Sequence, residues 1–212
     1  MNEKDRNAPL TVLIVILVGA GVAWAGSQGS ASAFGIPIFA IAVALAFLIQ
    51  WAAFIPAYVR KTERFFDLTG SITYITVTTL AVVLSPRVDG RSLLLLALVT
   101  IWAGRLGTFL FQRVRKAGKD ARFDELKTSF ARFLNTWTLQ GLWVTLTLSA
   151  ALAAITTTVR KDLGLFALVG FGVWAGGFAL EVAADRQKRR FREDPEHEGD
   201  FIDTGLWAWS RH

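Results

Sequence analysis

Six apolar stretches, each close to the length of a bilayer crossing, constrain this chain more than any other feature. A membrane-spanning helix needs about 20 mostly apolar residues. The stretches cover residues 10–26, 34–56, 68–84, 92–111, 135–157 and 163–184. Hydrophobic residues make up 53% of the sequence and charged residues 19%, a composition that excludes intrinsic disorder. We therefore predict an all-α fold: a single polytopic membrane domain, residues 1–212, with six transmembrane helices and a cytoplasmic tail at 185–212.

The third stretch is the least apolar of the six, because it contains Thr73, Thr76, Thr78 and Thr79. A threonine hydroxyl is tolerated inside a membrane helix when it donates to a backbone carbonyl one turn earlier. We therefore expect these threonines to bond within their own helix.

The distribution of Lys and Arg supports the same division and predicts an orientation. If the N-terminus is cytoplasmic, 18 of the 23 Lys and Arg fall in cytoplasmic segments, 4 fall in outer loops, and Arg105 lies inside a span. Cytoplasmic segments of membrane proteins carry this excess, so we predict that both termini are cytoplasmic. A net charge of +6 is also typical of nucleic-acid binding, but here the charge serves topology. We predict membrane lipids, and no nucleic acid, as partners.

One alternative concerns the first stretch. Residues 23–25, Ala-Trp-Ala, resemble a signal-peptidase site after a short apolar core,. The preceding tail is charge-neutral, however, whereas signal peptides begin with a basic region,. We therefore favour a retained first span, and an intact mass lower by about 25 residues would contradict it.

Composition removes several kinds of chemistry. The chain has no cysteine and only two histidines, His197 and His212. Disulfides, thiolate catalysis and thiolate metal sites are excluded, and we predict no metal site. His197 lies in a charged segment typical of a solvated loop.

Arg105 is a candidate for function because it lies inside the fourth stretch, after Trp102. A charge at the bilayer centre costs about 2.5–3.5 kcal/mol on insertion scales. The alternative is snorkelling, because Arg105 is about two turns from the cytoplasmic end and its long side chain can reach the interface. The sequence does not decide between the two.

A second candidate is the helix face that leaves the membrane after the sixth stretch. Glu181 and Asp185 are four residues apart, and Arg189 and Arg192 continue the same face,. Carboxylates there can accept hydrogen bonds from ribose, and arginines can bind phosphates. The alternative is an ordinary interfacial helix end with ion pairs, which explains Glu181 least well because it lies deepest.

Four segments of the chain form a distinctive set of motifs. They are Phe65–Ser71 (FFDLTGS), Trp102–Thr108 (WAGRLGT), Gly118–Phe123 (GKDARF), and Glu181, Asp185 and Gln187 followed by Phe201–His212 (FIDTGLWAWSRH). From about residue 60 onward the chain resembles the bacterial steroid 5-alpha-reductase-like membrane proteins, a family long described as a domain of unknown function.

The resemblance implies a helical membrane protein in a prokaryotic inner membrane that binds NADPH from the cytoplasmic side and reduces an activated double bond in a hydrophobic, lipid-like small molecule. By position it implies cofactor-binding residues, which are Glu181, Asp185, Arg189, Arg192, Arg211 and His212. It also implies a helix-interior polar pair, Trp102 and Arg105, near the substrate. The same superfamily contains isoprenylcysteine carboxyl methyltransferases, so S-adenosylmethionine is the alternative cofactor. A non-catalytic membrane protein is the third hypothesis, and self-association is left open.

The chain departs from the family pattern in two places. The family motif continues beyond His212 with Pro-Asn-Tyr and a further helix, so we expect the printed chain to lack part of the cofactor pocket. Eukaryotic steroid reductases use a tyrosine as proton donor where this chain has Trp102, and an indole is no acid at neutral pH. The catalytic acid is therefore unassigned, with Tyr74 and Tyr58 as candidates that the sequence does not place.

Overall fold

The computed structural model describes residues 3–159, 161–197 and 199–209. The chain divides into two compact units, Met1–Asp162 and Leu163–His212, each with its own internal packing. The six α-helices of the described residues are all long and apolar enough to cross a membrane. The predicted all-α polytopic fold is therefore confirmed.

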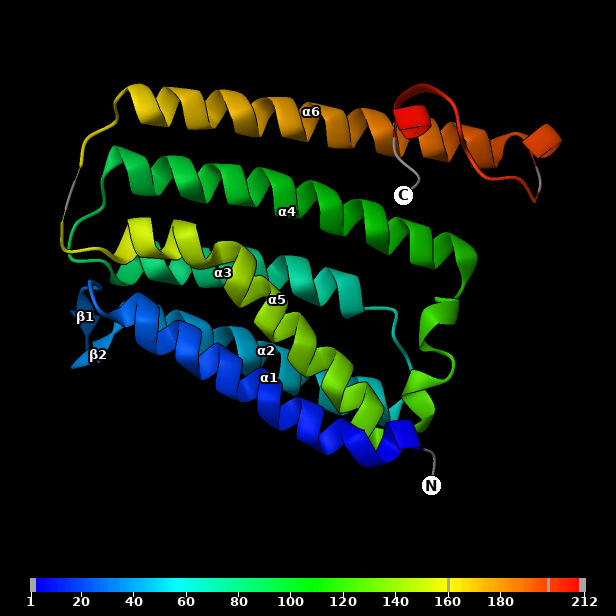
Figure 1. Ribbon diagram of the computed structural model, residues 1–212, viewed down its shortest axis with the longest axis horizontal. Helices are drawn as coiled ribbons and strands as arrows, with labels where there is room; N and C mark the ends of the chain where they lie inside the picture. The colour runs from blue at the N-terminus through cyan, green and yellow to red at the C-terminus, as the bar shows by residue number, and fades with distance from the viewer. Residues whose placement is uncertain (1–2, 160, 198, 210–212) are drawn as a thin grey trace. The chain divides into compact units, whose positions relative to one another are not determined.

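The first unit is a bundle of helices that run alongside one another (Figure 1). Its α-helices are α1 (Glu3–Ser27), α2 (Ile38–Val59), α3 (Phe66–Leu84), α4 (Gly90–Ala117) and α5 (Phe130–Thr156). Two short strands, β1 (Ser32–Ala33) and β2 (Ile36–Pro37), join α1 to α2, and two short 3-10 helices, η1 (Ala121–Phe123) and η2 (Leu126–Thr128), lie between α4 and α5.

Helix α5 is central to this unit, because it packs against α1, α2 and α3, while α3 also packs against α4. Its buried side chains include Trp137, Val144 and Leu152. Helix α1 approaches α2 closely because a glycine leaves room for an aromatic ring: a Cβ atom at Gly26 would lie 2.3 Å from the ring of Phe39. Close packing of this kind holds membrane helices together, since lipid offers no hydrophobic drive between them.

Two of the four threonines named in the third stretch bond inside their own helix, as predicted. Thr73 Oγ1 donates to the carbonyl of Thr69 at 2.7 Å, and Thr78 Oγ1 donates to that of Tyr74 at 2.8 Å. Thr73 Oγ1 also accepts a 2.7 Å hydrogen bond from Nε2 of the fully buried Gln50 on α2. These bonds satisfy donors in a helix whose threonines dilute its apolar character.

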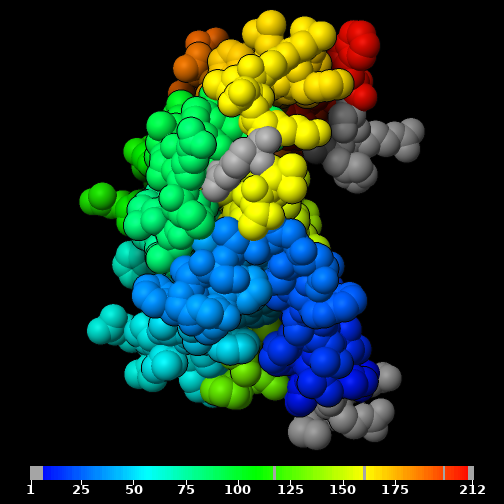
Figure 2. Space-filling model, turned by 90° about the vertical axis from the view of Figure 1, so that its left-hand side faces the viewer, coloured from blue at the N-terminus to red at the C-terminus, as the bar shows by residue number. Residues whose placement is uncertain are grey.

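A hairpin covers one end of the first unit, where the sequence predicted the start of the second span. Residues 34–37 belong to a turn and to β2 rather than to a helix. Phe34 and Gly35 make the two-residue turn with φ values of 56° and 78°, as a tight antiparallel hairpin requires. The backbone N–H of Ala31 donates to the carbonyl of Thr156 at the end of α5, at 2.6 Å. Figure 2 looks onto this end, with the hairpin in blue.

The second unit consists of one long helix and the segment that follows it. Helix α6 spans Leu165–Glu193, and the 3-10 helices η3 (Pro195–His197) and η4 (Gly205–Trp209) come after it. The helix extends nine residues beyond the predicted span end at residue 184. Hydropathy marks where a helix leaves the apolar layer, whereas Arg, Lys and Gln, which make up most of the extension, are good helix formers,.

Candidate functional site

The two halves of the C-terminal motif meet in the second unit. Gln187 Oε1 accepts a 2.9 Å hydrogen bond from the backbone N–H of Leu206. Trp207 Nε1 donates to the carbonyl of Ala184 at 3.0 Å. The turn that makes this possible requires glycine, because Gly205 has φ 61° and a Cβ atom there would lie 2.7 Å from Gln187 Oε1. Gln187 and the Gly-Leu-Trp sequence are therefore one structural feature, although 17 residues separate them in the chain.

Between α6 and this returning segment lies an open cavity of about 950 Å³. Its lining combines two cations, two carboxylates and several aromatic rings. The lining residues are Lys188, Phe191, Arg192, Asp200, Phe201, Ile202, Asp203, Trp207, Ala208 and Trp209. Lys188 Nζ lies 4.4 Å from the centre of the Trp207 ring, within the range of a cation–π contact. The volume falls in the range of small-molecule sites.

The predicted cofactor residues are distributed unevenly with respect to this cavity. Arg192 lines it. Glu181 and Asp185 are half-buried on α6 and, at about 100° per residue, lie on the same side of the helix as Arg192. Arg189 is exposed on α6 and is not among the lining residues. Arg211 and His212 lie outside the described residues.

In the first unit, Trp102 packs against a buried tyrosine. The ring of Tyr74 on α3 meets Trp102 on α4 edge to face, with centroids 5.0 Å apart. Tyr74 is 6% exposed, and its hydroxyl forms a 2.6 Å hydrogen bond with Thr147 Oγ1 on α5. Arg105, one turn after Trp102, is half-buried, and its guanidinium lies 5.5 Å from the centre of the Phe109 ring.

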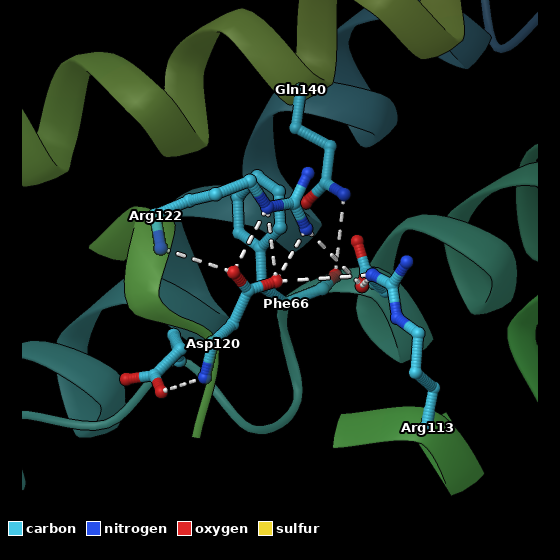
Figure 3. Close-up of polar contacts among 7 residues, drawn as sticks. Phe66, Arg113, Asp120, Arg122 and Gln140 are labelled. Carbon is cyan, nitrogen blue, oxygen red and sulfur yellow. Dashed lines mark hydrogen bonds and ion pairs between the residues drawn. The ribbon is translucent and has the colours of Figure 1, made fainter. Parts of the chain in front are cut away.

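A cluster of charged side chains lies at the end of the first unit opposite the hairpin. It connects the start of α3, the last turns of α4 and the segment around η1. We call Asp67, Arg113, Asp120 and Arg122 the charge cluster. Arg113 Nη2 lies 3.8 Å from an oxygen of Asp67 and 3.8 Å from one of Asp120. Arg122 Nε donates to Asp120 Oδ1 at 2.9 Å. Figure 3 shows both guanidinium groups turned toward the carboxylate of Asp120.

Glu63 and Lys127 extend the charge cluster beneath η1. Glu63 is 4% exposed; its carboxylate accepts from the backbone N–H of Asp120 at 2.9 Å and from Lys127 Nζ at 2.9 Å. Burial by itself raises the pKa of Glu63, but these two donors outweigh it and hold the pKa below its ordinary value. The pKa of Asp120 is also lowered, chiefly by the hydrogen bonds from Arg122.

An aromatic layer supports the charge cluster from inside the bundle. The Phe66 ring meets Phe123 at 4.9 Å and Trp137 at 5.1 Å between centroids, and Gln140 Nε2 donates to the Phe66 carbonyl at 3.2 Å. Two of the motif segments, Phe65–Ser71 and Gly118–Phe123, therefore meet in space. The sequence pattern identified both motifs but not the contact between them. The acid near the start of an apolar helix and the Asp-Ala-Arg sequence of the loop were signals for an ion pair.

The fold and these sites define a helical membrane protein with a ligand-sized cavity beside α6 and a charge cluster within its first unit. The chain belongs to the family described as "Protein of unknown function (DUF1295)", which it matches over residues 53–212. This range includes all four motif segments. No curated protein and no solved structure matches the chain.

Proposed function

We propose that this membrane protein is an NADPH-dependent reductase of a lipid-like compound with an activated double bond, and that the cofactor binds in the cavity of the second unit. The observation that carries the proposal is the lining of that cavity. Lys188 and Arg192 supply positive charge, and Phe191, Trp207 and Trp209 supply aromatic faces. Phosphate groups pair with cations such as these, and nucleotide bases stack on aromatic faces.

The two cations of the lining, Lys188 and Arg192, favour NADPH over S-adenosylmethionine. NADPH carries phosphates that pair with Lys and Arg, whereas S-adenosylmethionine has a sulfonium cation and no phosphate. Asp200 and Asp203 accept hydrogen bonds from ribose hydroxyls in either case. They are also the observation that keeps the methyltransferase as the second candidate, because a carboxylate stabilises a nearby cation.

When bound, NADPH supplies a hydride to one carbon of the double bond. The other carbon then takes a proton, for which the chain needs an acid. Both tyrosines of the chain, Tyr58 and Tyr74, belong to the first unit, whereas the cavity belongs to the second, so we assign the acid to neither.

Cofactor binding is tested by the thermal midpoint of the purified protein in detergent with NADPH, NADH or S-adenosylmethionine. A bound ligand raises the midpoint in proportion to RT ln(1 + [L]/Kd). We expect NADPH to stabilise the wild type, and Lys188→Gln and Arg192→Gln to weaken NADPH binding about tenfold or more. Arg190→Gln, exposed on the same helix and not among the lining residues, is the matched control.

The outcomes separate the hypotheses. Stabilisation by S-adenosylmethionine alone would establish the methyltransferase. No response to any of the three ligands would favour a non-catalytic membrane protein. Equal loss of NADPH affinity in the lining variants and in Arg190→Gln would contradict the cavity as the binding site.

A further inference from the structure

A small groove on the first unit lies between the α2–α3 connection and the last turns of α4. It has a volume of about 250 Å³ and is lined by Arg64, Phe65, Phe111, Val114 and Arg115. The groove therefore has a cation on each side, one from each element, and an apolar floor between them. None of these residues belongs to the charge cluster or to the cavity of the second unit.

The two arginines of the groove differ from those of the charge cluster. Arg113 and Arg122 pair with Asp67 and Asp120. Arg64 and Arg115 are exposed, and neither is paired with a carboxylate within residues 3–159, 161–197 and 199–209. Two unpaired guanidinium groups facing one groove favour an anion, because each presents a fork of donors that matches a phosphate.

The floor of the groove is suited to hydrocarbon. The rings of Phe65 and Phe111 stack with centroids 6.0 Å apart and 22° between their planes. Phe65 remains 54% exposed, whereas Val114 beneath it is 5% exposed. An exposed phenylalanine beside arginines at a helix end is typical of the membrane interface, where an apolar ring meets lipid and cations meet headgroups.

The charge distribution places the groove at the inner leaflet. Both of its elements belong to the predicted cytoplasmic segments, where Arg60, Lys61 and Lys116 add further positive charge. The cytoplasmic leaflet is the anionic one, and it attracts basic segments close to its surface. An anion at this level that also has hydrocarbon attached is a phospholipid.

We propose that this groove is a binding site for one anionic phospholipid of the inner leaflet. Arg64 and Arg115 bind the phosphate, and Phe65 and Phe111 contact the first part of an acyl chain. The lipid ties the α2–α3 connection to the end of α4. The site is independent of the proposed cofactor cavity, because every residue that lines it belongs to the first unit.

The experiment measures retention of added lipid by the delipidated protein in native mass spectrometry, with phosphatidylglycerol or phosphatidylcholine as the probe. We expect one phosphatidylglycerol to bind the wild type at least about tenfold more tightly than phosphatidylcholine. The double variant R64Q/R115Q should lose that preference. The control R60Q/K61Q also removes two positive charges, both from the α2–α3 connection, and should keep that preference.

Three results would overturn the proposal. One is equal affinity of the wild type for both lipids. Another is equal loss of phosphatidylglycerol in R64Q/R115Q and R60Q/K61Q, which would indicate general surface charge. The third is displacement of phosphatidylglycerol by millimolar inorganic phosphate, which would assign the groove to a soluble phosphate compound. Phe65→Ala, which leaves both arginines in place, should weaken phosphatidylglycerol binding and leave the thermal midpoint unchanged.

Discussion

Glu63 is buried and Asp67 and Asp120 are half-buried in the first unit, and each has a cation within 4 Å. A buried carboxylate is costly unless it is paired and hydrogen-bonded. Glu63 meets both conditions, because it accepts from Lys127 and from the backbone N–H of Asp120. It therefore holds the loop of η1 and η2 against the start of α3, and removing its charge should loosen that loop.

We predict that Glu63→Gln lowers the free energy of unfolding by about 1–3 kcal/mol, because a buried carboxylate that accepts two hydrogen bonds is lost. The measurement is a denaturant or thermal unfolding curve in detergent. Glu125→Gln is the control: the Glu125 side chain is 85% exposed and pairs with Arg132 at 3.5 Å, so its loss should change stability by less than about 1 kcal/mol. Equal effects of the two variants would contradict the role of Glu63.

The lowered pKa values of Glu63 and Asp120 predict loss of stability in acid. The folded state holds both groups below their ordinary values of 4.5 and 3.8. Between the folded and the unfolded pKa values of these two groups, the unfolded chain binds more protons. The contribution of Glu63 and Asp120 to stability is therefore full above about pH 4.5 and falls as the pH drops toward their folded pKa values. Thermal midpoints between pH 7 and pH 3 should show this fall. Glu63→Gln should reduce it, whereas an identical pH profile in that variant would exclude Glu63 as a contributor.

The sequence did not predict which individual residues form ion pairs across the fold. Asp67 and Asp120 both lie in motif segments, but 53 positions separate them, and only the packing of α3 and α4 brings them to the same arginines. Local spacing found the helix face of Glu181 and Asp185, because partners four residues apart on one helix are set by its geometry. Contacts between distant segments depend on register, which no local pattern contains.

At the scale of elements, the approach of α3 to α4 depends on one glycine. A Cβ atom at Gly107 would lie 2.5 Å from Cβ and Oγ of Ser71, whereas a Cβ atom at Gly104 would meet nothing within 4 Å. We predict that Gly107→Ala destabilises the protein by about 1–3 kcal/mol, since a packed contact must open. Gly104→Ala, one turn earlier, should be neutral or stabilising by up to about 1 kcal/mol. Unfolding curves of the two variants test this, and a neutral Gly107→Ala would contradict the close contact.

The position of a helix was predictable where the helix coincides with an apolar run. The residues at which a helix begins and ends were harder to predict. The hairpin was missed because Phe34, Ile36 and Pro37 read as apolar residues continuous with the second span. The turn depends instead on backbone conformation, with positive φ at Phe34 and Gly35. For α6, hydropathy ended the apolar span at residue 184, and the helical spacing of Glu181, Asp185, Arg189 and Arg192 carried the helix beyond that point, in agreement with its end at Glu193,.

For the whole molecule, the distribution of charge and the fold together predict how the protein is oriented in the membrane. The hairpin and the charge cluster lie at opposite ends of the first unit, because successive spans alternate in direction. The excess of Lys and Arg lies on the side of the charge cluster. The proposed phospholipid site depends on that orientation being correct.

The absence of native cysteine makes the orientation directly measurable. Phe34→Cys introduces a thiol at a hairpin position that is 90% exposed, and Glu125→Cys introduces one where the native side chain is 85% exposed. In intact cells a membrane-impermeant maleimide should label Phe34→Cys and leave Glu125→Cys unlabelled, because only the hairpin faces outward under the positive-inside rule. After lysis both should react. The reverse pattern would place the charge cluster and the Arg64–Arg115 groove on the outer face, and the inner-leaflet phospholipid would then be the wrong ligand for that groove.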